Sequence, residues 1–105
     1  MSDGRLQALE AMRAVKPHDT RVLFALANEY EKTANWDRVV ALLSEYLELT
    51  DDEGNAWGRL GYAHGQLGRA DEARAAYQRG IEAANQNGHP TMAAEFEEAL
   101  EGIAG

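Results

Sequence analysis

The chain contains no cysteine, only two prolines and no long run of apolar residues. The absence of cysteine excludes a disulfide, a thiolate nucleophile and a zinc site with sulfur ligands. A helix that crosses a bilayer needs about 20 predominantly apolar residues, and the start of the chain, from Met1 to Arg5, lacks the apolar segment of a signal peptide. We therefore expect a cytoplasmic protein without a membrane-spanning segment. Its 105 residues are enough for one domain with a continuous core.

Basic residues are also scarce, with 10 Lys and Arg against 18 Asp and Glu and a net charge of −8. This charge repels phosphate backbones and anionic lipid, so neither nucleic acid nor a membrane surface is an expected partner. The acidic excess lies toward the two ends, and residues 91–105 carry four acidic residues and no Lys or Arg. The charge can serve as a solvated surface or as an attractive field for a basic partner, and the solvated surface is the commoner case.

Apolar residues recur at helical spacings along nearly the whole chain, and turn residues interrupt them at regular intervals. Pro17 ends the first stripe, and Asp19 and Asn35 are predicted helix N-caps. Gly68 suits a left-handed helix end, and Pro90 suits a first helical turn. The predicted segments within a single domain 1–105 are an N-terminal packing helix over 4–17, helix pairs over 19–52 and 54–87, and a C-terminal capping helix over 90–104.

The two predicted helix pairs repeat one another in sequence about 34 residues apart. Large apolar residues fall on large ones and small residues on small ones, so we expect the two helices of each copy to pack in the same way. We expect Ala27 and Gly61 to be small because helix backbones approach closely there. The matched pairs are Leu23 and Trp57, Leu26 and Leu60, Ala27 and Gly61, Ala34 and Gly68, Val39 and Ala73, Leu43 and Tyr77, and Leu47 and Ile81.

The second copy resembles the tetratricopeptide repeat, whose pattern is W-x2-L-G-x2-Y followed by A-x3-F. Trp57, Leu60 and Gly61 fit it, while His64 stands at the usual Tyr position and Asn85 at the usual closing Pro. The first copy fits more loosely. The resemblance implies an all-α fold, a right-handed superhelix of about six antiparallel helices, of the kind found in short stand-alone bacterial members. The first predicted helix is then the second half of a preceding repeat, and the last one solvates the end of the array.

The resemblance also implies a site, because partners of this family usually lie along the concave surface formed by the first helix of each pair. The expected function is a non-enzymatic protein-interaction module that binds a peptide or helix of a partner. The alternative is a structural protein that self-associates as a homo-oligomer without a separate ligand. The expected oligomeric state is a monomer or a weak homodimer. The positions that correspond to the exposed groove are Arg21, Phe24, Asn28, Glu31, Lys32, Asn55, Gly58, Tyr62, Gly65 and Gln66.

Phe24 and Tyr62 stand out because they fall off the apolar stripes of their helices. They can anchor a peptide, or they can pack on the first and the last predicted helix. A clamp for a terminal carboxylate is not expected: Asn28 fits one of its positions, but Phe24 replaces a needed Lys or Arg and Tyr62 a needed Asn. Gly58 and Gly65 would leave a shallow trough, unless they are neutral replacements in a helix held by other contacts.

The sequence offers no concentrated catalytic or metal-binding group. His18, His64 and His89 share no ligand spacing, and we expect His64 to fill a core position. The acidic run from Asp51 to Gly54 lacks the alternating ligands of a calcium loop. We therefore expect no enzymatic activity, no metal and no cofactor.

Overall fold

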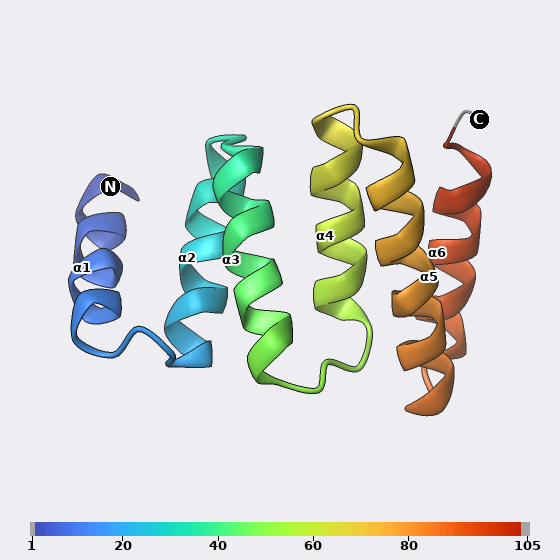
Figure 1. The fold of residues 1–105 in the computed structure, drawn as a ribbon, viewed down its shortest axis with the longest axis horizontal. Helices are drawn as coiled ribbons and strands as arrows, with labels where there is room; N and C mark the ends of the chain where they lie inside the picture. Colours follow the sequence, from blue (N-terminus) through green and yellow to red (C-terminus); the bar gives the residue numbers. More distant parts are fainter. Residues whose placement is uncertain (1, 104–105) are drawn as a thin grey trace. The chain divides into compact units, whose positions relative to one another are not determined.

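The computed structural model describes residues 2–103, and within this range every regular element is an α-helix (Figure 1). The prediction of an all-α chain of six helices is confirmed. The first helix starts two residues earlier than expected, and Ala104, the predicted end of the last one, lies outside the described residues. The helices are α1 (Ser2–Val15), α2 (Thr20–Lys32), α3 (Trp36–Leu49), α4 (Asn55–Gln66), α5 (Ala70–Gln86) and α6 (Pro90–Glu101).

The chain forms two compact units, which meet in sequence after Thr50. The first unit contains α1, α2 and α3, and the second contains α4, α5 and α6. Within each unit, consecutive helices run antiparallel (Figure 1). The most extensive helix packing joins α2 to α3 and α4 to α5, which are the two predicted helix pairs.

The two units fill their interiors with different side chains. The first unit buries branched aliphatic residues of α2 and α3, among them Leu23, Leu26 and Leu43. The second unit buries mainly alanines, such as Ala63 and Ala73, together with larger side chains that include Leu60 and Tyr77.

Gly61 is buried in the second unit, as the sequence suggested. A Cβ atom at this position would lie 2.9 Å from the ring of Tyr77. The nearest atoms that a larger residue would meet therefore belong to an aromatic side chain of α5.

Two of the helix starts illustrate how far cap prediction succeeds. Asp19 caps α2 as predicted, since its Oδ1 accepts a hydrogen bond from the backbone N–H of Arg21 at 3.0 Å. Asn35 occupies the N-cap position of α3 as predicted, but its side chain makes no capping hydrogen bond. At the start of α4 the N-cap residue is Gly54, and Oδ2 of Asp52 accepts from the N–H groups of Gly54 at 2.8 Å and Ala56 at 2.9 Å.

The tight turns inside the two helix pairs place equivalent residues in the left-handed region of backbone space. Gly68 has φ of 74°, as its position after α4 predicts. Ala34, its counterpart in the first copy, has φ of 56°. A residue with a Cβ atom adopts this conformation at a cost of roughly 1–2 kcal/mol, so the first copy is strained where the second is not.

Polar contacts attach α1 to the rest of the first unit. Arg13 reaches Glu45 of α3 at 2.7 Å, and Arg38 of α3 reaches Glu10 of α1 at 3.1 Å. The hydroxyl of Tyr30 donates to the same Glu10 carboxylate at 2.5 Å. Leu9 of α1 is also buried, so the helix is held by apolar packing as well as by charge and hydrogen bonding.

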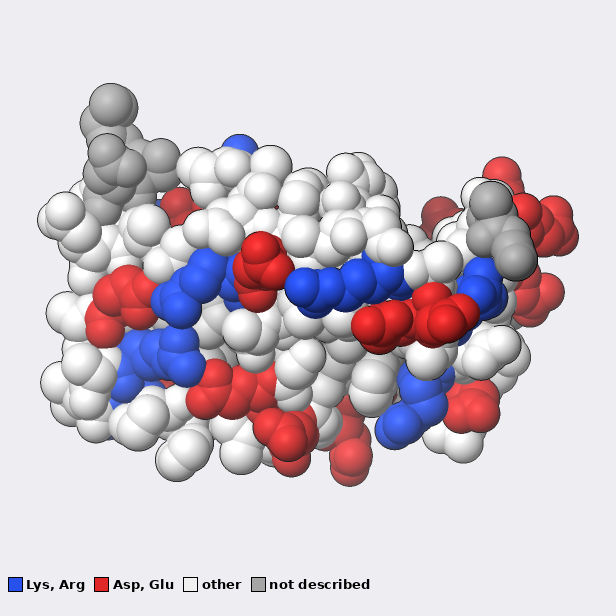
Figure 2. Space-filling model, turned by 45° about the horizontal axis from the view of Figure 1, so that its top comes forward, with Lys and Arg blue, Asp and Glu red and all other residues white. Residues whose placement is uncertain are grey.

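An aromatic ring attaches α6 to the second unit. The ring of Phe96 lies against Gly58 of α4 and Gly80 of α5, and its centroid is 5.9 Å from that of Tyr77. The exposed positions of α6 include four glutamates and no Lys or Arg. Figure 2 shows these acidic side chains gathered over α6, at the right of the view. The predicted amphipathic, acidic end helix is present.

Candidate partner-binding site

In the first unit, the predicted groove residues lie on α2 and only some of them line a pocket. Arg21, Phe24 and Asn28 line a pocket of about 290 Å³, which we call the first-unit pocket. Tyr46 of α3 closes one side, with its ring centroid 5.2 Å from that of Phe24. Phe24 thus packs on α3, where the sequence had suggested the first helix as its neighbour.

The other two predicted residues of α2 lie away from this pocket. Lys32 is exposed, and its Nζ forms an ion pair with Glu29 at 2.9 Å. Glu31 is half-buried. Glu29 itself is a buried carboxylate, which also accepts a hydrogen bond from Arg5 of α1 at 3.0 Å. The hydrogen bond from Lys32 is the main cause that lowers the pKa of Glu29, burial opposes it, and Arg5 adds to the lowering.

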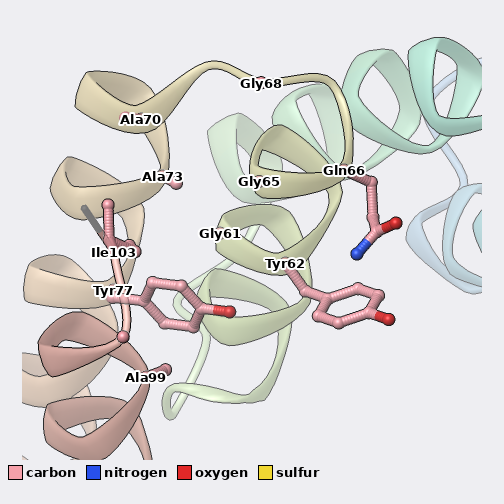
Figure 3. Close-up of a pocket in the computed structure, with 11 residues that line it drawn as sticks. Gly61, Tyr62, Gly65, Gln66, Gly68, Ala70, Ala73, Tyr77, Ala99 and Ile103 are labelled. Carbon is pink, nitrogen blue, oxygen red and sulfur yellow. The ribbon is translucent and has the colours of Figure 1, made fainter.

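In the second unit, Tyr62, Gly65 and Gln66 of α4 line a larger pocket of about 470 Å³, which we call the second-unit pocket. Ala70 and Tyr77 of α5 form its opposite side, and residues at the end of α6 complete it. Figure 3 shows the ring of Tyr77 directed from α5 toward α4, with Ala99 and Ile103 beside it. Tyr62 and Gln66 project from α4 on the side away from α5 (Figure 3). None of the lining residues is charged.

Gly58 does not belong to an exposed surface, and this part of the prediction is wrong. The glycine is buried, because a Cβ atom there would lie 2.3 Å from Cε1 of Phe96. Gly65 differs: it is exposed, and no atom lies within 4 Å of the place where its Cβ would be. Of the two glycines predicted to form a trough, one makes room for a ring of the same chain and the other leaves open space.

Tyr62 and Asn55 are both exposed on α4, and of the two Tyr62 lines the second-unit pocket. Tyr62 is 52% exposed, so about half of its surface is accessible to a partner. Sequence reasoning missed the pocket residues outside the first helix of each pair, including Tyr46, Ala70 and Ile103. The sequence did not distinguish these residues, because each resembles an ordinary member of the apolar stripe of a helix.

Two titratable groups near the second-unit pocket are shifted by burial. Burial lowers the pKa of His64, with a further lowering by the charge of Arg69. His64 is half-buried rather than fully in the core, and its Nδ1 is shielded from solvent. Burial also raises the pKa of the Tyr77 hydroxyl. The lining of the pocket contains no charged residue, which favours apolar ligands over ions.

The described part of the chain holds no group of three or more His, Cys, Asp or Glu side chains that could bind a metal ion. His89 contacts Glu53 at 2.6 Å in the second unit, and this pair is not part of such a group among the described residues. Among residues 2–103, no helix has both the length and the apolar character needed to cross a membrane.

Comparison with known proteins supports the interpretation of the fold. The tetratricopeptide repeat family model matches residues 54–87, the second predicted repeat. No curated protein matches the chain in sequence. The resemblance to this family is confirmed: the chain contains a tetratricopeptide repeat, and its six helices have the fold of tetratricopeptide repeat proteins.

Two solved proteins illustrate that likeness. PcrH, in complex with the chaperone binding region of PopD, is similar with a TM-score of 0.85 and 19% identity, over 97% of this chain and 77% of PcrH. MamA is similar with a TM-score of 0.74 and 20% identity, over 97% of this chain and 68% of MamA. At these identities the likeness concerns the fold.

Proposed function

We propose that the protein binds a peptide or a helix of another protein through α2 and α4, the first helices of its two pairs, and that it has no catalytic activity. The observation that carries this proposal is the position of the two pockets. Each unit has a pocket along the first helix of its pair, and three predicted groove residues line each one. A cytoplasmic location and a protein or peptide as the partner belong to the same proposal.

The similarity to PcrH supports this function at the level of the fold, since PcrH was crystallised with the chaperone binding region of PopD. The surface that each unit offers is small. We therefore expect modest affinity for a linear peptide, unless several segments bind at once. The scarcity of titratable groups at the pockets supports a binding role over a catalytic one.

The experiment compares matched substitutions in a titration with a partner purified from the native host. Asn28→Ala and Gln66→Ala remove polar groups at the two pockets. Their controls are Asn85→Ala and Gln78→Ala, which remove the same side chains from exposed positions on α5. We expect each pocket variant to weaken binding about fivefold, the value of one hydrogen bond. Equal affinity for all four variants would exclude α2 and α4 as the binding surface.

Self-association is the second candidate function, and an exposed apolar pair on α1 favours it. Met12 and Val15 are 52% and 78% exposed and lie one turn apart. If they mediate assembly, light scattering will show a dimer at high micromolar concentration that Met12→Ser and Val15→Ser abolish. Leu49→Ser, at an exposed position of α3, is the control. A strict monomer at that concentration would remove this candidate.

A further inference from the structure

The second copy of the repeat has smaller side chains than the first at several positions that line the second-unit pocket. With the offset of 34 residues, Trp36 corresponds to Ala70, Val39 to Ala73 and Glu31 to Gly65. The three smaller residues all line the pocket. At these three positions the second copy therefore has a smaller side chain than the indole, the branched side chain and the carboxylate side chain of the first copy.

The walls of this pocket indicate what can fill it. Its lining has no charged residue, and the rings of Tyr62 and Tyr77 stand where the first copy has Asn28 and Leu43. Aromatic walls favour an aromatic or other bulky apolar group, because rings pack well against rings in offset or tilted arrangements. An ion would lose its hydration without gaining a partner there.

Charge next to the pocket adds a second requirement. Ala99 and Gly102 of the lining each lie one helical turn after a glutamate, Glu95 and Glu98 respectively, so these carboxylates share their side of the helix. Both glutamates are exposed, and α6 has no Lys or Arg to neutralise them. A partner that places basic residues beside its apolar group complements this surface.

We propose that the second-unit pocket receives one bulky apolar side chain, tryptophan best of all, from a partner segment that carries Lys or Arg on both sides of it. This inference rests on the proposed function and specifies the ligand of one of its two pockets. In this arrangement the partner's side chain takes the place of the larger side chains that the first copy has at the three corresponding positions.

The test uses capped heptapeptides with a central tryptophan flanked by glycines and by two lysines at each end, titrated against the full chain and followed by amide NMR. Matched peptides replace the tryptophan with alanine or the lysines with glutamates. We expect at least about tenfold weaker binding without the tryptophan and about threefold weaker binding with glutamates at low salt. The expected reporters are the glycine resonances of the pocket lining, Gly61, Gly65, Gly68 and Gly102.

Two substitutions place the effect in the pocket. Ala70→Trp restores the residue of the first copy and should abolish the peptide-induced shifts, whereas Ala75→Trp, at an exposed position of the same helix, should leave them intact. If Ala70→Trp loses helicity, Gly65→Leu serves instead, because open space surrounds a Cβ at that position.

Several results would overturn the proposal. One is that the tryptophan peptide causes no shifts at millimolar concentration. Another is that the alanine peptide or the glutamate peptide binds as tightly as the parent peptide. The last is that the pocket-filling variant binds the peptide as tightly as the unsubstituted chain. Glycine shifts that grow with protein concentration alone would show that a second copy occupies the pocket. If the peptide does not bind but Asn28→Ala and Gln66→Ala still weaken binding of the natural partner, this inference is wrong and the proposed function is retained.

Discussion

The first and second units share the same helix pair but hold their third helix by different interactions. In the first unit, α1 is attached by ion pairs such as Arg13 to Glu45 and Arg38 to Glu10. In the second, α6 is attached by the ring of Phe96, which lies against Gly58 and Gly80. The comparison shows that a repeat pattern specifies the pair and leaves the attachment of a flanking helix to residues outside the pattern.

We expect the largest loss of stability where the packing of the second unit requires a glycine. Gly58→Ala places a methyl group into the ring of Phe96, so α6 or the ring must move. We expect a loss of about 1–3 kcal/mol in the free energy of unfolding, with faster amide exchange in α6. Chemical denaturation and hydrogen exchange measure the two effects.

Gly65→Ala is the matched control on the same helix. Its added methyl group meets no atom, and alanine favours helix over glycine by up to about 1 kcal/mol. The two substitutions should therefore change stability in opposite directions. Equal effects would show that the buried ring contact is not what fixes α6.

The equivalent turns should respond to opposite substitutions. Ala34→Gly relieves a left-handed residue in the first unit, and Gly68→Ala introduces one in the second. After the entropy of glycine is counted, we expect a gain of about 0.5–1 kcal/mol for the first and a loss of similar size for the second. Thermal and chemical unfolding give both values. Changes of the same sign would contradict the equivalence of the two turns.

Salt should distinguish the two flanking helices without any substitution. Screening weakens the ion pairs around α1, whereas it has little effect on the apolar contact of Phe96. Amide protection in α1 should fall as sodium chloride is raised, while protection in α6 stays constant. A decrease of similar size in both helices would remove the proposed difference.

Acid should also act mainly on the first unit, through Glu29. Because the folded-state pKa of this carboxyl is lowered, chiefly by the hydrogen bond from Lys32, its charged form stabilises the fold. This contribution is present above the unfolded-state pKa and is lost as the pH falls through the folded-state pKa. Urea midpoints should fall on acidification less steeply in Glu29→Gln than in the parent chain. Glu48→Gln, at an exposed position of α3, should behave like the parent.

The helices were predictable from the sequence because their signals are local. Apolar spacing placed all six, Asp19 identified a cap, and Gly68 identified a left-handed turn. Asn35 stands at the predicted N-cap of α3 without a side-chain hydrogen bond, because a suitable residue type does not guarantee that its side chain reaches the helix N–H groups. Asp52, which does reach them at the start of α4, was interpreted only as part of an acidic break.

The site was less predictable because it depends on contacts between helices. The family pattern placed Gly58 on an open surface, but the ring of Phe96 covers it, and no local pattern links residues so far apart in the sequence. Tyr62 was identified because it falls off the apolar stripe, and Gly65 because it stands at a groove position of the family pattern. At three positions the second-unit pocket is lined by residues smaller than their counterparts in the first copy, and a search for chemical groups does not detect such positions.

The stacking of Tyr77 on Gly61 gives the second unit a spectroscopic label of its own. A glycine under an aromatic ring has its α-protons in the ring current, so their resonances are displaced upfield from those of an ordinary helix. Departure of α4 from α5, or entry of another ring beside Tyr77, changes that displacement. One proton pair thus reports both the integrity of the repeat and the occupancy of the adjacent pocket.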